Sequence, residues 1–266
     1  MKKITLVTGA SSGLGKDIAR RLCKNGHIVY VTARRKNELI NLQKKCSNYN
    51  GEIKIISGDL SNKNFRENAV SQILKEEGKI DYLINNAGFG KVISFEKQSV
   101  DEIQKMFDLN VVAYLHLTNL VLKNMLKRNK GKIIHIGSVA TFVPRPYYTI
   151  YNSTKSAIYT FNRSLKFELK KTNVSSSMVL VPKIKTDFAQ TAFENYNVEK
   201  AKKYISDFNK SAEDSEIIAK KIIKKLNSNK EIIIPNFRAF ICYLSRYFPE
   251  IVDFILEKFF IKKNKN

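Results

Sequence analysis

The sequence predicts an α/β protein with a single domain, in which helices cover both faces of a doubly wound parallel β-sheet. Three observations predict this fold class. Short apolar runs of strand length alternate with longer segments of helical periodicity from residue 3 to about 235. The run at 80–85 (IDYLIN) is apolar almost throughout, as expected of a strand buried on both faces. No repeat or low-complexity linker divides the chain.

Composition narrows the class of protein. The chain has 266 residues, of which 43% are hydrophobic and 27% charged, and this suits a globular protein with a large core. The first ten residues (MKKITLVTGA) contain an apolar run too short for a signal peptide, and nowhere do roughly eighteen apolar residues follow one another. We therefore expect a cytoplasmic protein without a membrane-spanning helix.

The few cysteines and histidines give no sign of a metal site. The three cysteines show neither metal-ligand nor disulfide spacing, which indicates a reducing compartment; they are Cys23, Cys46 and Cys242. We expect the three histidines to be structural, and no metal is predicted; they are His27, His116 and His135.

The net charge of +23 can indicate a nucleic acid or an anionic membrane as partner. The positive residues are mostly lysine, however, and they are spread along the whole chain. This pattern favours a general compositional bias, and we expect no nucleic-acid partner. An anionic, phosphorylated cofactor would still gain from the positive field.

A glycine-rich turn (TGASSGLG) follows the first predicted strand, 3–8, and opens a helix that runs to residue 25. This order suits a phosphate group, because a helix N-terminus presents free N–H groups. We expect Gly9 to permit the tight turn, Gly13 to let the backbone approach a pyrophosphate, and Gly15 to let the helix pack against the strand. The expected donors are Ser11, Ser12 and the backbone of Leu14.

The second predicted strand, 27–32, ends beside Arg34 and Arg35. In a dinucleotide-binding fold this end meets the adenosine ribose, where a carboxylate favours a free 2′-hydroxyl and an arginine favours a 2′-phosphate. No Asp or Glu occurs between Asn25 and Asn37. The sequence therefore predicts NADP(H), with Arg34 as the main contact and Arg35 as a second; the alternative is an ordinary basic start to the next helix.

A helix over 36–47 and a strand over 52–57 lead to Asp59 and Leu60. Asp59 can accept a hydrogen bond from an adenine amino group or cap the next helix, 62–77, for which Ser61 is the alternative cap. The strand at 80–85 ends in small and amide residues that permit close approach to a ribose, namely Asn86, Ala87 and Gly88.

Residues 99–128 show the apolar periodicity of one long helix, within which Asn110 is a poor helix former and is expected to have a buried polar role. The strand at 132–137 ends at Ser138. A helix over 149–171 carries Tyr151 and Lys155, whose spacing of four puts an ammonium beside a phenol. A nearby positive charge lowers the pKa of a phenol, so that it can act as a general acid or base. Alone, this spacing also fits a core tyrosine with a solvated lysine.

The remaining predicted elements are a strand at 176–181, a variable segment at 187–210, a helix at 213–227 and a strand at 231–234. Aromatic side chains are frequent at 139–150 and 187–210, which indicates either an apolar pocket for a hydrophobic carbonyl compound or ordinary packing under a lid. These side chains include Phe142, Tyr147, Tyr148, Phe188, Phe193 and Tyr196.

Together these motifs resemble the short-chain dehydrogenase/reductase family of about 250 residues. The resemblance runs from about residue 3 to 235 and includes T-G-x-x-x-G-x-G at 8–15, Asp59, N-N-A-G at 85–88 and Y-x-x-x-K at 151–155. The family usually has Pro-Gly after the sixth strand, whereas this chain has Pro182 at the usual glycine position, counted back from Thr186. The chain therefore departs from the family pattern at a position that the resemblance places beside the nicotinamide.

The resemblance implies a Rossmann-like fold and a catalytic set of Asn110, Ser138, Tyr151 and Lys155. By analogy with the family, Tyr151 exchanges a proton with the substrate oxygen, Lys155 lowers the tyrosine pKa and holds the nicotinamide ribose, and Ser138 binds the carbonyl oxygen. Asn110 would keep a water in a proton relay, while Ile184 and Thr186 would contact the carboxamide. The implied function is an NADP(H)-dependent carbonyl reductase or alcohol dehydrogenase; the alternatives are a 3-oxoacyl-thioester reductase of lipid metabolism and a catalytically idle NADPH-binding regulator.

We divide the chain into a nucleotide-binding domain, 1–236, and a helical extension, 237–266. Two short helices rich in Phe, Ile, Leu and Tyr are expected on either side of Pro249. Such an amphipathic segment can lie on an anionic membrane, cover the substrate pocket or pair with a second copy. By analogy with the family, the helices at 99–128 and 149–171 form a four-helix interface in a homodimer or homotetramer.

Overall fold

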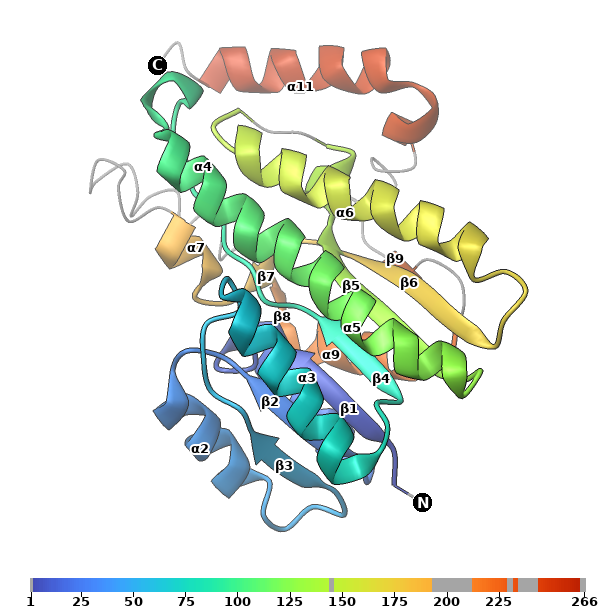
Figure 1. The fold of residues 1–266 in the computed structure, drawn as a ribbon. Helices are drawn as coiled ribbons and strands as arrows, with labels where there is room; N and C mark the ends of the chain where they lie inside the picture. The colour runs from blue at the N-terminus through green and yellow to red at the C-terminus, as the bar shows by residue number, and fades with distance from the viewer. Residues whose placement is uncertain (1, 144–145, 193–211, 229–231, 234–243, 264–266) are drawn as a thin grey trace.

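The computed structural model describes residues 2–143, 146–192, 212–228, 232–233 and 244–263. Within these residues, seven strands form one sheet in the order β3-β2-β1-β4-β5-β6-β9, and every neighbouring pair is parallel (Figure 1). The strands are β1 Ile4–Thr8, β2 Ile28–Thr32, β3 Glu52–Ile55, β4 Tyr82–Asn85, β5 Gly131–Ser138, β6 Val174–Val181 and β9 Ile232–Ile233. The predicted fold class is confirmed.

The strand order places a crevice at the carboxyl ends of β1 and β4. The chain runs outward from β1 to β3 and then returns to β4 on the other side of β1. Helices that leave neighbouring strands toward opposite faces separate at such a point and leave room for a ligand. The glycine-rich turn after β1 and the residues after β4 therefore share one site.

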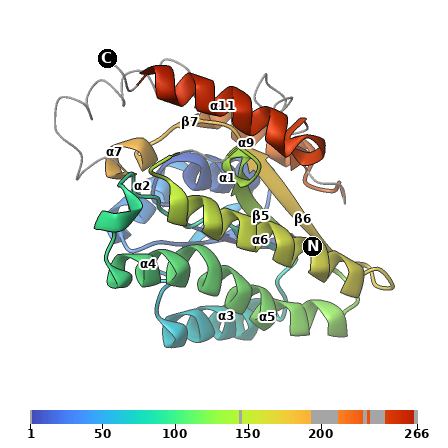
Figure 2. The same ribbon diagram turned by 90° about the horizontal axis from the view of Figure 1, so that it is seen from above.

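Helices cover the sheet in two layers, as the view from above shows (Figure 2). One layer contains α1 Gly13–Lys24, α2 Lys36–Lys45 and α9 Ser215–Lys224, whose apolar side chains form one core with the sheet. The other contains α3 Lys63–Glu77, α5 Ala113–Lys127 and α6 Thr149–Glu168, which form a second core on the opposite face. Burial of both strand faces explains the nearly continuous apolar runs in the sequence.

The single helix predicted at 99–128 is wrong in one respect. The chain forms α4 Val100–Phe107, a π-helical turn η2 at Asp108–Val112, and then α5. Asn110 lies inside this turn with its side chain fully buried. The apolar periodicity continues through the turn, so the pattern alone does not reveal it, whereas the misplaced asparagine does mark the position.

Other elements differ from the predictions mainly at their ends. The cap of α3 is Asn62, whose Oδ1 accepts a hydrogen bond from the Phe65 N–H at 3.1 Å. Both caps proposed from the sequence are therefore wrong, because Asp59 instead accepts from the Ser61 N–H within a local turn. Short elements that the sequence did not predict are η1 Phe95–Lys97, η3 Val139–Thr141, β7 Ile184–Lys185, α7 Phe188–Ala192 and β8 Glu213–Asp214.

The C-terminal segment contains a helical turn at 244–247 and helix α11 Pro249–Lys263, with Pro249 in the first helical position, where a proline is tolerated. Helix α11 lies at the end of the molecule beside α6 and far from β3 (Figure 1). The Ser245 hydroxyl donates to the Phe142 carbonyl, and the Arg246 guanidinium lies 4.2 Å from the Phe142 ring centroid. In the described part of the chain, no helix is long and apolar enough to cross a membrane.

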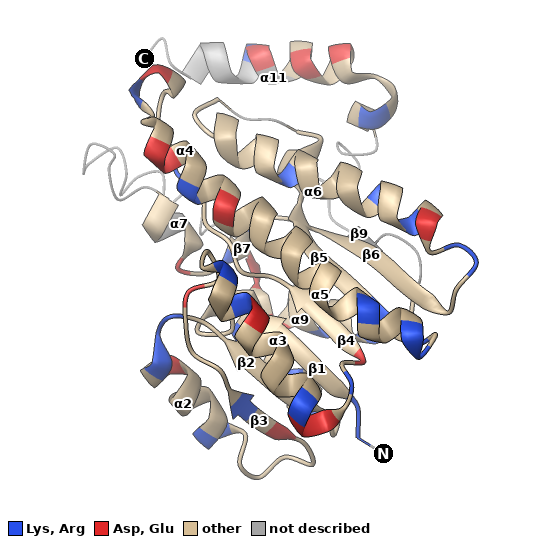
Figure 3. Ribbon diagram, viewed as in Figure 1, with Lys and Arg blue, Asp and Glu red and all other residues tan. Residues whose placement is uncertain are grey.

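Charged residues are distributed over the whole molecule. In Figure 3, Lys and Arg colour segments of most helices, and acidic segments lie between them. This agrees with the spread of lysines along the sequence.

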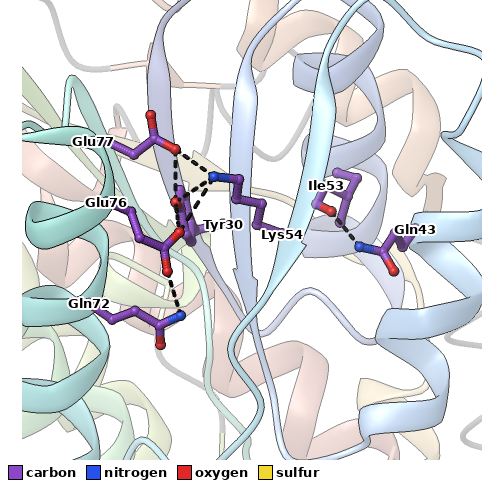
Figure 4. Close-up of polar contacts among 7 residues, drawn as sticks. All are labelled: Tyr30, Gln43, Ile53, Lys54, Gln72, Glu76 and Glu77. Atoms are coloured by element: carbon purple, nitrogen blue, oxygen red, sulfur yellow. Dashed lines mark hydrogen bonds and ion pairs between the residues drawn. The ribbon is translucent and has the colours of Figure 1, made fainter.

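A partly exposed polar cluster around the buried Tyr30 links α3 to the outer strands (Figure 4). The Tyr30 hydroxyl donates to Glu76 at 2.6 Å, and the Lys54 ammonium donates to Glu77 at 2.7 Å and to the Tyr30 oxygen at 3.1 Å. The Tyr30 side chain is only 1% exposed. The hydrogen bond from Lys54 lowers the pKa of Glu77, and the hydrogen bond from Tyr30 lowers the pKa of Glu76.

We expect Lys54→Met to lower the free energy of unfolding by about 1–2 kcal/mol at pH 7, because Glu77 loses a charge-assisted partner. A carboxylate whose pKa is lower in the folded than in the unfolded protein stabilises the fold at pH values above its unfolded pKa, about 4.3. This stabilisation is lost as the pH falls through the folded pKa. The difference between the variant and the wild type should therefore shrink below about pH 4. Urea unfolding at pH 7 and below about pH 4 measures the free energy of unfolding of both proteins. Lys63→Met, which removes an exposed ion pair with Glu67, is the control. An equal difference between Lys54→Met and the wild type at the two pH values would argue against the ion pair.

Candidate active site

The glycines of the glycine-rich turn pack too closely against their neighbours to be replaced by residues with a Cβ. Gly13 has a φ of +51°, and a Cβ there would lie 2.6 Å from Thr186 Cγ2. At Gly15 a Cβ would lie 2.4 Å from both the Gly9 carbonyl oxygen and Asn86 Nδ2. These contacts agree with the close packing predicted for Gly15. They also show a contact that the sequence did not reveal: the Thr186 side chain occupies the space beside Gly13.

Thr8 joins the end of β1 to the end of β4. Its Oγ1 accepts hydrogen bonds from the backbone N–H of Asn86 at 2.8 Å and of Ala87 at 3.0 Å. The Asn86 side chain in turn donates to the Thr8 carbonyl at 2.9 Å. Thr8 was not among the predicted site residues, although its place at the head of the T-G motif is a signal that could have identified it.

Arg35, rather than Arg34, lies on the glycine-rich turn. The Arg35 guanidinium donates to Ser12 Oγ at 2.7 Å and to Ser11 Oγ at 3.1 Å, and it lies 3.7 Å from the Asp187 carboxylate. Arg34 is exposed. The sequence predicted Arg34 as the main cofactor contact and Arg35 as the second. In this structure it is Arg35 that contacts the glycine-rich turn.

Asp59 and Leu60 follow β3 at the same edge of the sheet. Asp59 is exposed, whereas the Leu60 side chain is buried in the core and its carbonyl accepts from Arg66 at 2.5 Å. Leu60 can therefore reach a ligand only through its remaining backbone atoms.

The π-helical turn presents Asn110 to the loop after β4. The Asn110 amide donates to the Phe89 carbonyl at 2.8 Å and to Thr154 Oγ1 at 3.2 Å, and its Oδ1 accepts from the Phe89 N–H at 3.0 Å. A Cβ at Gly88 would lie 2.9 Å from Asn110 Oδ1 and 3.7 Å from Lys155 Nζ. The side chain of Asn110 thus fixes the loop and helix α6 beside Lys155.

Tyr151, Ser138 and Lys155 come together at the carboxyl end of β5. The hydroxyl groups of Tyr151 and Ser138 are hydrogen-bonded to each other. Ser138 Oγ also accepts from the Ala140 N–H at 3.1 Å. Lys155 Nζ donates to the Ile136 carbonyl at 3.2 Å and lies 5.7 Å from the Tyr151 ring centroid.

The local environment shifts both titratable groups. Burial raises the pKa of Tyr151 to about 12, although the hydrogen bond from Ser138 acts in the opposite direction. Burial also lowers the pKa of Lys155 to about 8. The sequence analysis expected a lowered pKa for Tyr151; in this structure burial dominates and the net shift is upward. At neutral pH the phenol therefore carries its proton.

An apolar wall lies over Tyr151. The Phe188 ring centroid is 5.3 Å from that of Tyr151, and Tyr148, Val92 and Ala192 complete the cluster. A Cβ at Gly90 would lie 2.7 Å from Phe188 Cζ and 3.1 Å from Tyr151 Cδ2. The sequence analysis expected Phe188 and Tyr148 here but missed Gly90 and Val92. Pro144, Phe193 and Tyr196 lie outside the described residues.

The histidines have structural surroundings. His27 Nδ1 is 2.9 Å from Thr5 Oγ1, His116 Nδ1 accepts from Arg66 Nε at 2.9 Å, and His135 is fully buried. Cys23 and Cys46 are buried free thiols in contact with each other, and Cys242 lies outside the described residues. Among the residues that the structure describes, no cluster of His, Cys, Asp or Glu could hold a metal ion.

Comparison with known proteins identifies the family. A family model described as short chain dehydrogenase matches residues 3–197. The chain belongs to the short-chain dehydrogenase family.

A short-chain dehydrogenase from Bacteroides thetaiotaomicron, named 3-ketodihydrosphingosine reductase, is 31% identical over 85% of this chain and 78% of its own length. A short-chain dehydrogenase from Burkholderia phymatum, solved with NAD, has a TM-score of 0.84 at 20% identity and covers 95% of both chains. A serine dehydrogenase complexed with NADP+ has a TM-score of 0.75 at 28% identity, over 87% of this chain and 94% of that one. Solved structures similar to this short-chain dehydrogenase thus include both an NAD and an NADP+ complex.

In this short-chain dehydrogenase, the segment after β6 packs Ile184 into the core and Thr186 against the glycine-rich turn. Ile184 starts the short strand β7, which pairs with β8, and its side chain is buried in the core beside α1. Thr186 Oγ1 accepts from the Phe188 N–H at 3.3 Å, while its methyl group fills the space beside Gly13. Ile184 was one of the two residues predicted to contact the carboxamide. Because its side chain is buried, Ile184 can contact a ligand only through its backbone atoms.

Proposed function

We propose that this short-chain dehydrogenase is an NADP(H)-dependent carbonyl reductase or alcohol dehydrogenase that acts on a hydrophobic ketone or aldehyde. One observation carries the proposal: a protonated, partly buried Tyr151, hydrogen-bonded to Ser138, lies beside the buried ammonium of Lys155. A proton donor, an oxygen-binding hydroxyl and a fixed positive charge are what reduction of a carbonyl group requires.

The residues around the crevice fit a phosphorylated dinucleotide. The turn from Gly9 to Gly15 has no room for a Cβ at its three glycines and leads into the N-terminus of α1, which suits a pyrophosphate. Two arginines, Arg34 and Arg35, follow β2, and this favours a 2′-phosphate. We propose that the remaining contacts come from Ser11, Ser12, Leu14, Asp59, Leu60, Asn86, Ala87, Gly88, Ile184 and Thr186, together with Tyr151 and Lys155.

The preference for NADPH has a direct test. We expect Arg34→Ala to raise the KM for NADPH about tenfold while the KM for NADH stays within about twofold, because a charge-assisted contact to phosphate is worth about 1.5–3 kcal/mol. Arg35→Ala should weaken both cofactors, since Arg35 also holds Ser11 and Ser12. Steady-state kinetics with both cofactors measure this, with Arg163→Ala on α6 as the control. An equal loss for NADH and NADPH in Arg34→Ala would contradict a phosphate contact.

In the proposed mechanism the protein orients the substrate and moves one proton. When bound, the nicotinamide supplies or accepts the hydride. Ser138 donates a hydrogen bond to the substrate oxygen and stabilises the charge that develops there. Tyr151 gives its proton to that oxygen in reduction and takes it back in oxidation. Lys155 is buried and keeps a positive charge beside the phenol, and Asn110 holds the loop at Phe89 against α6.

The apolar wall supports a hydrophobic substrate. Tyr148, Phe188 and Val92 border Tyr151, so that a carbonyl group bound there lies among apolar side chains. The similar protein from Bacteroides thetaiotaomicron is named for a long-chain ketone. A 3-oxoacyl-thioester is the alternative substrate. An idle NADPH-binding regulator is a weaker alternative, because all four predicted catalytic side chains are present.

The proposed function is tested by NADPH consumption against a panel of long-chain ketones, steroids, aldehydes and 3-oxoacyl thioesters. We expect turnover with at least one apolar carbonyl compound. Tight NADPH binding without turnover of any member of the panel would favour the regulator.

We also propose that the extension 237–266 contacts a lipid surface. On α11 the buried side is marked by Val252, which is 2% exposed, whereas acidic residues occupy another side. A third side of α11 exposes Ile251, Phe254 and Ile255 at helical spacing. Tyr247 and Phe248, which directly precede the helix, are exposed as well, and all five side chains are between 42% and 75% exposed. An aromatic, apolar stripe of this kind suits a membrane interface, and a second copy of the chain is the alternative occupant.

Phe248→Ser with Phe254→Ser should weaken binding to phosphatidylserine vesicles about tenfold or more, because each phenyl ring leaves the interface. Vesicle sedimentation measures the effect, and Val100→Ser, at an exposed apolar residue on α4, is the control. Wild-type protein that stays in the supernatant would rule out the lipid contact, and loss of self-association in the double variant without vesicles would show that a second copy covers this face.

A homodimer or homotetramer is the assembly that we propose. Residues Val112, Leu115, Leu122 and Leu126 recur at spacings of three, seven and four along η2 and α5, and Val112 and Leu126 are more than 40% exposed. This stripe would pack against a second copy, together with α6. Sedimentation velocity measures the oligomeric state, and a monomer at micromolar concentration would contradict the proposed assembly.

A cytoplasmic location stays a prediction from composition and the free thiols.

A further inference from the structure

Behind Lys155 lies a buried tyrosine that the proposed chemistry does not use. Tyr114 begins the first turn of α5, directly after the π-helical turn, and is 1% exposed. Its ring centroid lies 5.4 Å from Lys155 Nζ. The ring also stacks on His135, with centroids 6.1 Å apart and planes 21° apart. Asn85 donates to the Tyr114 carbonyl at 3.4 Å. The ring is thus buried in contact with His135 and Lys155, and the Asn85 side chain is hydrogen-bonded to the Tyr114 backbone.

The ammonium of Lys155 needs such a neighbour. Lys155 is 5% exposed, and burial of a charge is unfavourable unless polar or aromatic groups replace the lost water. The described groups around Nζ are the Ile136 carbonyl at 3.2 Å and the faces of Tyr114 and Tyr151. The titratable side chains that face it are Tyr151 on its own helix, Tyr114 on α5 and His135 on β5. Because burial lowers the pKa of His135 to about 3, that ring is neutral and leaves the ammonium unrepelled.

The ring of Tyr114, rather than its hydroxyl, makes the contact. Among the described residues, the Tyr114 hydroxyl has no hydrogen-bond partner, although it is buried. An aromatic face attracts a cation through its quadrupole, and this attraction is stronger where water is excluded. The π-helical turn supplies the geometry, since it lets Asn110 reach Phe89 while Tyr114, four residues later, faces Lys155.

We infer that Tyr114 is a positioning residue, whose ring face holds the Lys155 ammonium in place beside Tyr151. The catalytic part of this inference rests on the proposed function, because it assigns Lys155 to the same site. The electrostatic part does not, because the contact exists in the protein without cofactor or substrate.

Three replacements at position 114 separate the ring from the hydroxyl and from simple packing. Tyr114→Phe keeps the ring face and should retain activity within about twofold. Replacement by 3,4,5-trifluorophenylalanine keeps the shape but withdraws electrons from the face, and should lower kcat about tenfold. Tyr114→Leu removes the face and should lower kcat by at least as much. KM for the substrate should change little, because Tyr114 is buried behind Lys155.

A second measurement does not depend on turnover. The titration of Lys155, followed by NMR of the labelled ammonium or its adjacent methylene in the cofactor-free protein, should move to lower pH in the trifluorophenylalanine variant than in Tyr114→Phe. The fluorinated variant keeps the core filled, so it remains informative if Tyr114→Leu does not fold. Equal Lys155 titration in the phenylalanine and trifluorophenylalanine variants would overturn the inference, as would a large loss of kcat in Tyr114→Phe. If the wild type turns over no carbonyl compound, the proposed function fails while the titration still decides the role of Tyr114.

Discussion

Tyr151→Phe should lower kcat about 10²–10⁴-fold, because the substrate oxygen loses its proton donor. The benzene ring stays in place and still packs against Phe188 and Tyr148, so the fold and cofactor binding should remain within about twofold of the wild type. Loss of kcat without loss of cofactor affinity identifies an interaction made in the transition state. NADPH consumption and a fluorescence titration of NADPH binding measure the two quantities.

Tyr159→Phe is the matched control for this prediction. Tyr159 lies two turns further along α6 than Tyr151 and packs edge-on against Phe142. It should keep wild-type kcat. If Tyr151→Phe keeps more than about a tenth of the wild-type kcat, Tyr151 is not the general acid, and the proposed mechanism is wrong.

Gly15→Ala should weaken NADPH binding by at least about 100-fold, the second large effect that we expect. The added Cβ would lie 2.4 Å from both the Gly9 carbonyl oxygen and Asn86 Nδ2. The first of these atoms belongs to the backbone and cannot turn away, so the glycine-rich turn must move. The same shift would disturb the hydrogen bonds from Asn86 to Thr8. Fluorescence titration of NADPH measures the affinity.

Gly78→Asn is the control for Gly15→Ala. Gly78 ends α3 with a φ of +69°, and a Cβ there has nothing within 4 Å. Asparagine tolerates this backbone conformation, so the variant should lose little stability and keep its affinity for NADPH. An unchanged affinity in Gly15→Ala would show that the turn accommodates a side chain and would contradict the close packing described above.

Much of the fold could be predicted from the sequence, because local and tertiary preferences agree in most elements. The strand at 80–85 is apolar almost throughout because both sheet faces are covered, and the glycine-rich turn is visible in the sequence because its glycine positions leave no room for a Cβ. Positions defined by short motifs could be predicted as well: Tyr151, Lys155, Ser138 and Asn110 come together although up to 45 positions separate them in the sequence.

The features that could not be predicted from the sequence depend on contacts between distant segments. The π-helical turn leaves the apolar periodicity intact, so only Asn110 marked it. Arg34 and Arg35 are adjacent, and no local pattern shows that Arg35 bends back to Ser12. The net pKa of Tyr151 was mispredicted because its sign depends on how far the folded chain buries the phenol, which sequence spacing does not specify.

The most direct test of the central claim is transfer of deuterium from the nicotinamide 4-position to a carbonyl substrate. The purified protein would be incubated with NADPH that carries deuterium at both hydrogens of nicotinamide C4 and with the best compound from the panel, and the alcohol would be analysed by mass spectrometry. We predict one deuterium on the former carbonyl carbon in the wild type, and labelled alcohol formed at least about 100-fold more slowly with Tyr151→Phe. Alcohol without deuterium, or equal labelling by Tyr151→Phe, would contradict the account.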